Sequence, residues 1–191
     1  YTLPNNYQSV ENITALERGM SSNYTQAAVL SEALASLYKE GDLRLDAYFK
    51  AADKNGYRFS QKSGKDDFRC SFRVGEMYLN SAEAAAQSDK LPQARTRLLE
   101  LMQKRYTPEA YTVKATAVNA MTKEALIQEI LDERARELAF EGHRWFDLRR
   151  TTRPRIEKVL KGGTYVLEQD DSRYTIQIPR EAIAANPELS N

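Results

Sequence analysis

Four glutamates recur at every fourth position of one segment, and this spacing is the strongest constraint that the sequence places on its fold. They are Glu129, Glu133, Glu137 and Glu141, called the glutamate row below. Residues four apart lie on the same face of a helix, so the four carboxylates follow one side of it. Like charges at this spacing repel by ~0.2–0.5 kcal/mol per pair. A stable fold therefore has to bring cations to this face.

Arginine side chains are the candidates for these cations. They lie in the same predicted helix or in a segment before or after it: Arg73, Arg134, Arg136, Arg144, Arg149 and Arg150. We predict a partly buried Glu/Arg network that links residues 73–87, 122–141 and 144–150. Removing one partner of a buried pair would cost ~3–5 kcal/mol. The alternative is a solvated charged face, on which each ion pair contributes ~0–1 kcal/mol.

The composition excludes several other kinds of site. The 191 residues carry 28 Lys and Arg against 27 Asp and Glu, so no cationic excess is left for nucleic-acid phosphates. The single cysteine, Cys70, cannot form an intrachain disulfide, and the single histidine, His143, excludes two-histidine metal sites. No segment approaches the ~18 consecutive apolar residues of a membrane span. We therefore expect no cofactor, no metal, no nucleic acid and no transmembrane segment.

Apolar residues at three- and four-residue steps predict three helices, over residues 71–87, 92–105 and 122–141. The first two are separated by a short polar break, and Pro92 suits the first turn of the second, so we expect an αα-hairpin. Thr122 suits the N-cap of the third helix. A short amphipathic helix is predicted over 144–150. We interpret residues 107–121 as a loop.

The two ends of the chain have weaker patterns. Residues 1–30 are polar and turn-rich, and we expect an irregular segment there; Ser31 then suits a helix N-cap. Residues 53–67 suit a strand or a surface loop. Alternating polarity over 164–168 and 173–178 predicts a C-terminal β-hairpin. The expected fold class is mainly α: an αα-hairpin, a long helix with a short one after it, irregular loops and this hairpin.

Four blocks of the sequence, in this order, resemble the motifs of one known family. They are residues 31–49, residues 73–84 (RVGEMYLNSAEA), residues 133–150 (ERARELAFEGHRWFDLRR) and residues 178–187 (IPREAIAANP). The chain is similar here to the SusD/RagB group, the nutrient-binding outer-membrane lipoproteins of Bacteroidetes. The resemblance covers roughly residues 30–191.

The resemblance implies that residues 31–191 are the C-terminal domain of a SusD-like protein. Family members are much longer, begin with a lipoprotein signal and an acylated cysteine, and carry tetratricopeptide-type helices in their N-terminal half. We therefore expect this chain to be a soluble fragment of a surface-exposed outer-membrane protein, whose lipid anchor lies in the missing part.

The resemblance also implies a function. Family members capture oligosaccharides, polysaccharides or other nutrients without catalysis, and deliver them to a partner TonB-dependent transporter of the SusC type. Two alternatives stay open: a helical protein-interaction module that docks on a transporter, and a carbohydrate-active hydrolase that uses a pair of carboxylates. Nothing in the sequence selects such a pair.

We expect most motif residues to stabilise the fold rather than to bind a ligand. They are Arg73, Glu76, Tyr78, Glu83, Glu133, Arg134, Glu137, Glu141, Gly142, Arg144, Trp145, Phe146, Asp147, Arg149 and Pro179. In the family, ligand contacts come from variable loops. Aromatic side chains in such loops can stack on the apolar faces of sugar rings. Our candidates for ligand binding are Tyr48, Tyr57, Phe59 and Tyr111, for which ordinary partial burial is the alternative.

Overall fold

The computed structural model describes residues 11–16, 29–62, 69–160 and 162–189. It divides into two compact units, Tyr1–His143 and Arg144–Asn191. In the described parts of the chain, no helix is both long enough and apolar enough to cross a membrane.

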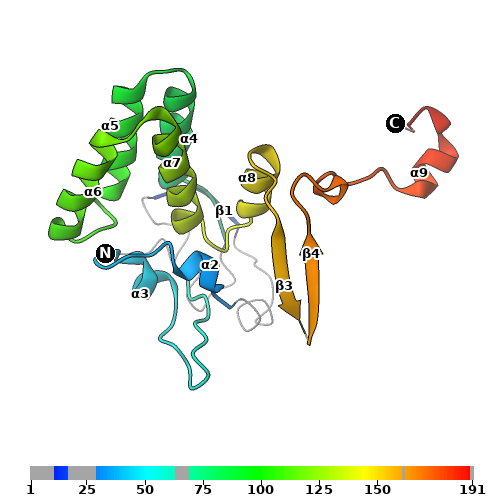
Figure 1. Ribbon diagram of the computed structural model, residues 1–191, viewed down its shortest axis with the longest axis horizontal. Helices are drawn as coiled ribbons and strands as arrows, with labels where there is room; N and C mark the ends of the chain where they lie inside the picture. Colours follow the sequence, from blue (N-terminus) through cyan, green and yellow to red (C-terminus); the bar gives the residue numbers. More distant parts are fainter. Residues whose placement is uncertain (1–10, 17–28, 63–68, 161, 190–191) are drawn as a thin grey trace. The chain divides into compact units, whose positions relative to one another are not determined.

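The longest described helices of the first unit are α4 (Val74–Gln87), α5 (Leu91–Met102), α6 (Pro108–Ala120) and α7 (Lys123–Glu137). Helices α4 and α5 form the predicted αα-hairpin, and α7 packs along α4 (Figure 1). Fully burying one leucine or isoleucine contributes ~1.5–3 kcal/mol, so the shared apolar cluster is a main source of stability. Its buried members are Leu79, Ala82, Ala85, Ala86, Ala94, Leu98, Leu101, Met102, Tyr106, Val118, Leu126 and Ile130.

Helix α6 occupies the segment for which the sequence predicts a loop, so that prediction is wrong. The hydroxyl oxygen of Thr107 accepts a hydrogen bond from the backbone N–H of Ala110 at 3.3 Å, and Pro108 stands in the first turn. Both are ordinary signals of a helix start. Val118 is the buried residue of this helix. A single buried position produces almost no periodic apolar pattern, which is why the periodicity argument missed α6.

Helix α7 begins as predicted but ends early. The hydroxyl oxygen of Thr122 accepts from the N–H of Ala125 at 3.3 Å, so the predicted cap is confirmed. The helix ends at Glu137, whereas the pattern predicted helix to residue 141. Phe140 (φ 62°) and Gly142 (φ 88°) then have left-handed backbone, which turns the chain. Glu141 therefore lies outside the helix.

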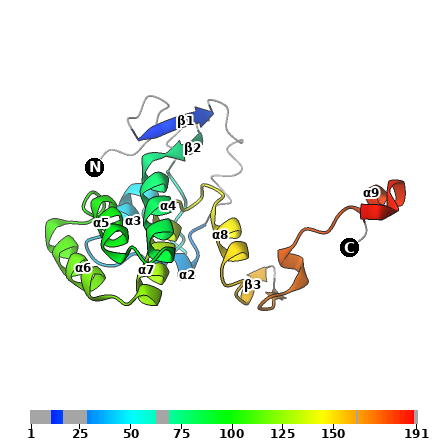
Figure 2. The ribbon, with the colours of Figure 1, turned by 90° about the horizontal axis from the view of Figure 1, so that it is seen from above.

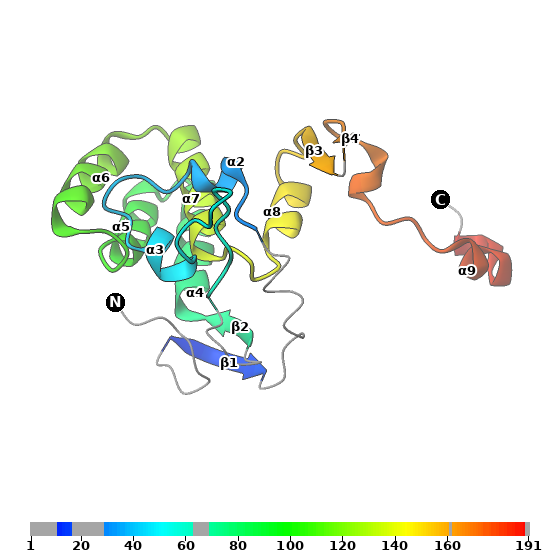
Figure 3. The same ribbon diagram turned by 90° about the horizontal axis from the view of Figure 1, so that it is seen from below.

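A two-stranded sheet lies at the start of α4. Strand β1 (Asn12–Leu16) pairs antiparallel with β2 (Arg69–Arg73), and β2 runs directly into α4 (Figures 2 and 3). The helix predicted from Ser71 thus begins only at Val74, whose N–H donates to the carbonyl of Glu11 at 3.0 Å. Strand pairing supplies partners for backbone groups of β2, and this long-range contact has no local signal in the sequence.

Two short helices, α2 (Glu32–Ala35) and α3 (Arg44–Tyr48), precede the sheet strand β2. The hydroxyl of Ser31 caps α2, as predicted. Between the helices, Asp42 forms an isolated antiparallel bridge with Tyr106, which lies between α5 and α6. This bridge brings the start of α3 beside the segment that joins α5 to α6. A smaller apolar cluster around α3 contains Tyr38, Tyr48, Phe49 and Ala139.

The second unit contains α8 (Arg144–Arg150), β3 (Ile156–Leu160), β4 (Gly163–Leu167), α9 (Arg180–Ala185) and two 3-10 turns, η1 (Ser172–Tyr174) and η2 (Pro187–Leu189). Helix α8 and a β-hairpin are both confirmed.

The strands of this hairpin differ from the prediction. Strand β4 lies one residue earlier than the predicted 164–168. Its partner is β3, which precedes it, and the segment 173–178 is not a strand. The turn between β3 and β4 contains Gly162, with φ 77°. Glycine adopts this conformation without a steric penalty, which suits Gly162 to the tight turn between the two strands. Asp171 caps the η1 turn by accepting from the N–H of Arg173 at 2.8 Å.

Candidate functional site

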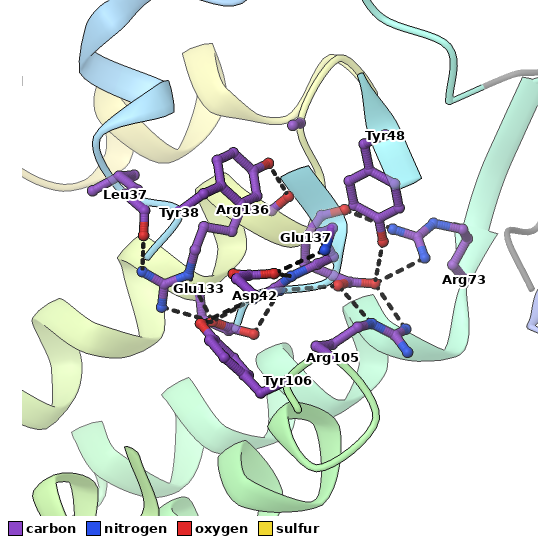
Figure 4. Close-up of polar contacts among 12 residues, drawn as sticks. Leu37, Tyr38, Asp42, Tyr48, Arg73, Arg105, Tyr106, Glu133, Arg136 and Glu137 are labelled. Carbon is purple, nitrogen blue, oxygen red and sulfur yellow. Dashed lines mark hydrogen bonds and ion pairs between the residues drawn. The ribbon is translucent and has the colours of Figure 1, made fainter. Parts of the chain in front are cut away.

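Glu137, the third member of the glutamate row, is the centre of a buried ionic network (Figure 4). Its side chain is fully buried, and three guanidinium groups surround its carboxylate. Arg105 binds it through two nitrogens at 2.9 Å each. Arg73 lies at 3.0 Å and Arg44 at 3.2 Å. The hydroxyl of Tyr48 adds a longer hydrogen bond of 3.4 Å.

Glu133, one turn earlier in α7, holds the second half of the network. Its carboxylate oxygens lie 2.7 Å from Nη1 of Arg44 and 2.6 Å from Nη2 of Arg136. Arg44 also binds Asp42, with Nη2 2.8 Å from Oδ2 of that carboxylate. The hydroxyl of Tyr106 accepts from Arg44 at 3.1 Å. Arg44 therefore bridges both buried glutamates of α7 to the start of α3.

The outer members of the glutamate row are paired as well. Glu141 lies 2.9 Å from Nη2 of Arg73 and also pairs with Lys62. Glu129 lies 2.5 Å from Nη2 of Arg136 and 3.0 Å from Nζ of Lys114. Each member of the row thus has at least two cationic partners, and the predicted pairing of Arg73 with the row is confirmed.

Helix α4 comes unusually close to this network at Gly75. A Cβ atom added to Gly75 would lie 2.9 Å from Oε1 of Glu137, closer than side chains normally approach. The absence of a side chain there leaves room for the Glu137 carboxylate beside α4. Arg73, at the last position of β2, can then reach the same carboxylate from the start of the helix.

The surrounding arginines hold the carboxylates of Glu133 and Glu137 in the ionised form. Burial alone would raise the pKa of Glu137, but Arg105 and Arg73 outweigh it and hold that pKa well below its usual range. For Glu133, the opposing effect of Arg44 and Arg136 likewise lowers the pKa despite burial. A general acid needs a proton to give at working pH, so these two carboxylates are poorly suited to that role.

The four predicted ligand-binding aromatics lie in different surroundings. Tyr48 is fully buried against the network, and Tyr111 lies on α6, half-buried against the helical core. Packing against the protein interior therefore explains both tyrosines without a ligand. Phe59 is half-buried and pairs through its backbone with Val29. Tyr57 is 54% exposed.

Tyr57 lies near the tip of a hairpin-like segment, here called the 48–61 hairpin, where its carbonyl accepts from the N–H of Asp53 at 2.9 Å. This segment projects from the helices as a cyan loop (Figure 1). Its two arms are joined by the N–H of Lys50, which donates to the carbonyl of Phe59 at 2.9 Å. At the tip, one carboxylate oxygen of Asp53 accepts from the N–H groups of Asn55 and Tyr57, both at 2.8 Å. The exposed ring is therefore carried by an ordered turn.

A comparison with protein-family models identifies the chain. The model described as the SusD family matches residues 22–191, which is most of its length. The chain belongs to the SusD family. The predicted resemblance to the SusD/RagB group is therefore confirmed. A search of curated proteins found no match.

Solved structures share the fold of this SusD-family chain. A SusD-like carbohydrate-binding protein from Bacteroides vulgatus has a TM-score of 0.58 at 19% identity, over 87% of this chain and 44% of its own. A SusD superfamily protein from Bacteroides fragilis has a TM-score of 0.60 at 20% identity, and the match covers 84% of this chain and 36% of the Bacteroides fragilis protein. A proposed sugar-binding protein from Bacteroides vulgatus has a TM-score of 0.57 at 24% identity, and the match covers 83% of this chain and 37% of that protein. The chain thus spans less than half the length of these proteins, and the mainly α fold class is confirmed.

The SusD-family motif on α4 packs against α7. Tyr78 is half-buried against the helical core, and Glu76 and Glu83 are half-buried on the same helix. The motif residue Arg134 of α7 donates from Nη1 to the side-chain oxygen of Asn80 at 2.6 Å. These contacts hold the two motif helices together.

The motif residues of the second unit are arranged around α8. The ring of Trp145 stacks on that of Tyr174, with centroids 5.1 Å apart and planes at 8°. Asp147 is buried and lies 2.7 Å from Nη2 of Arg150. Phe146, in contrast, is 62% exposed.

The remaining motif residues mark the ends of elements. Gly142 precedes α8, where Arg144 is exposed and the carbonyl of Arg149 accepts from Arg153 at 3.1 Å. Pro179 stands just before α9. The part of the predicted network that involves residues 144–150 stays a prediction.

Sequence reasoning missed much of the network. Arg44, Arg105, Lys62, Asp42 and Glu11 were not among the candidates, although Glu11 binds Arg105 at 3.0 Å and Arg73 at 3.3 Å. One local signal was present. Asp42 accepts from both the backbone and the side chain of Arg44, which is a pairing available at that spacing.

The lowered pKa values predict that acid destabilises the fold. Glu133, Glu137 and Glu141 have a lower pKa in the folded chain than the value of about 4.5 in the unfolded chain. Their ionised forms therefore stabilise the fold fully above about pH 4.5, and this stabilisation is lost as pH falls through the folded pKa. Each such group changes the free energy of unfolding by up to ~1.4 kcal/mol per pH unit. Urea unfolding at a series of pH values measures this slope. We expect a shallower slope in Glu137→Gln than in the wild-type chain; equal slopes would contradict the assignment.

Proposed function

We propose that this protein captures glycans at the bacterial cell surface, without catalysis, and delivers them to a TonB-dependent outer-membrane transporter of the SusC type. The observation that carries the proposal is the SusD family match over residues 22–191. Two of the similar structures are described as a carbohydrate-binding and a proposed sugar-binding protein, which supports a saccharide as the ligand. In the proposal, a lipid anchor in the parent protein holds it at the outer surface of the outer membrane.

The 48–61 hairpin supports a ligand contact at Tyr57. An exposed aromatic ring offers an apolar face to a sugar ring and a hydroxyl for a hydrogen bond. The Asp53 turn fixes the backbone that carries the ring, so less conformational entropy is lost on binding. Phe59, on the returning arm, adds a half-buried aromatic side chain to the same hairpin.

Tyr57→Ala tests this contact. We expect glycan affinity to fall about 5- to 30-fold, because losing one aromatic contact costs ~1–2 kcal/mol. The midpoint of thermal unfolding should stay unchanged, since the ring is 54% exposed. A glycan array identifies a ligand, and titration calorimetry then compares the variants.

Tyr165→Ala is the matched control, since Tyr165 is an exposed tyrosine of the second unit. It should bind as tightly as the wild-type chain. Unchanged affinity in both Tyr57→Ala and Phe59→Ala, with intact folds, would remove the 48–61 hairpin from the proposed site.

A hydrolysis assay on the same glycans separates capture from catalysis. Glycosidases need one carboxyl group that keeps its proton, and the surrounding arginines hold Glu133 and Glu137 ionised. Binding without turnover supports capture. Turnover that is lost when one carboxylate pair is replaced would instead favour the hydrolase. Binding to a transporter by a chain that binds no glycan would favour the interaction module.

A further inference from the structure

Lys62 directly follows the 48–61 hairpin and is buried at its base. The side chain of Lys62 is 6% exposed. The N–H of Gln61 donates to the carbonyl of Tyr48 at 2.8 Å, which closes the hairpin just before Lys62. The side-chain amide of Gln61 donates to the carbonyl of Phe49 at 3.1 Å. Gln61, the neighbour of Lys62 in the chain, therefore connects the two arms of the hairpin at its base.

The ammonium group of Lys62 reaches the end of α7. Nζ donates to the carbonyls of Glu137 and Ala139, the latter at 3.2 Å, and pairs with the carboxylate of Glu141. It also lies 4.1 Å from the centre of the Tyr48 ring, as a cation above an aromatic face. The carbonyls at a helix C-terminus carry partial negative charge and favour a cation. All these contacts use either the positive charge or one of three N–H donors.

The charge of Lys62 is finely balanced by its neighbours. Among the described residues, the charged groups with the largest effect on it are Glu141, Arg73 and Glu137, and the titratable Tyr48 lies against it. Burial is the largest influence and lowers the pKa of Lys62 to about 8, since Glu141 and Glu137 only partly oppose burial and Arg73 adds to it. A neutral amine keeps two donors and no charge, so it cannot maintain the full set of contacts.

We propose that Lys62 is a positioning residue whose protonated ammonium group anchors the 48–61 hairpin to the end of α7, and whose deprotonation loosens that hairpin. The consequence for ligand binding rests on the proposed function, because it requires Tyr57 to contact a glycan. The anchor itself does not, since it concerns only the contacts of Lys62. Glycan capture through this hairpin is then stronger in neutral than in mildly alkaline solution.

NMR on the 191-residue chain tests the anchor without any ligand. The methyl groups of Ala51 and Ala52 lie on the hairpin and do not exchange with solvent, so their ¹³C shifts report on it at any pH. We expect these shifts to titrate together with the ¹³Cε shift of Lys62, with a midpoint of about 8. Lys62→Met removes the charge and Lys62→Arg keeps it throughout this range, so both should abolish the step.

Lys54→Met is the matched control, because Lys54 is an exposed lysine of the same hairpin. It should leave the titration of the alanine methyls unchanged. A titration that persists in Lys62→Met, or flat alanine shifts in the wild-type chain while Lys62 itself titrates, overturns the anchor.

Glycan affinity provides an independent second readout. If a glycan binds, we expect its affinity to fall as pH rises through about 8 in the wild-type chain and to be independent of pH in this range in Lys62→Met. If no glycan binds at any pH, the proposed function fails while the alanine titration still decides the anchor. A pH-independent wild-type affinity, together with a clear alanine titration, would overturn the link between anchor and ligand.

Discussion

Glu137→Gln is expected to lower the free energy of unfolding by about 3–5 kcal/mol. The substitution keeps the volume of the side chain and removes the charge that Arg44, Arg73 and Arg105 share. Breaking a buried ion pair by removing one partner has this cost because the remaining charges stay buried without compensation. Domains are stable by only ~5–15 kcal/mol, so the loss would be a large fraction of the total.

Urea unfolding measures the effect, with Glu124→Gln as the matched control. Glu124 lies in the first turn of the same helix and is exposed. Its replacement removes only a favourable interaction with the helix N-terminus, worth ~0.3–1 kcal/mol. Equal stability losses in the two variants would show that the Glu137 carboxylate is effectively solvated. That result would favour the alternative in which the glutamate row is a solvated charged face.

Gly41→Ala is expected to be the second strongly destabilising change. Gly41 has φ 79°, and its carbonyl accepts from the N–H of Thr107 at 2.9 Å. A Cβ atom at this position would lie 2.4 Å from Cβ of Ala110, on α6. The left-handed backbone costs a residue other than glycine ~1–2 kcal/mol, and overpacking adds ~1–3 kcal/mol. The change also disturbs the bridge that brings Arg44 to the network.

Gly56→Ala separates the two causes. Gly56 has a similar φ of 83°, but a Cβ atom there would meet nothing within 4 Å. We expect this variant to lose only the backbone part, ~1–2 kcal/mol. Thermal unfolding of both variants gives the comparison. If Gly41→Ala is no less stable than Gly56→Ala, the close approach between Gly41 and α6 contributes nothing to stability.

Local signals predicted the strongest parts of the fold. The apolar periodicity of α4, α5 and α7, the Thr122 cap and the proline at the start of α5 are all properties of neighbouring residues, so they can be recognised in the sequence. Helix α6 was missed because it buries too few residues to produce a period. Strand β2 was missed because its partner is β1, more than 50 residues earlier in the chain.

The candidate site was predicted only in part. The requirement that cations face the glutamate row followed from electrostatic repulsion, and Arg73 was among the named candidates. The other partners of Glu137, Arg44 and Arg105, come from segments whose proximity depends on the bridge between Asp42 and Tyr106. Such a bridge closes a long loop, and no local pattern marks it.

Residue spacing alone was enough to establish the glutamate row, the main helices and the resemblance to the SusD/RagB group, because each of these repeats or persists along the chain. The tertiary structure decided which cations neutralise the row, that Tyr48 is buried while Tyr57 is exposed, and that Lys62 reaches the end of α7. The physical reason is that burial and charge pairing depend on distances in space. Segments far apart in the sequence set those distances when the apolar faces of the helices pack together.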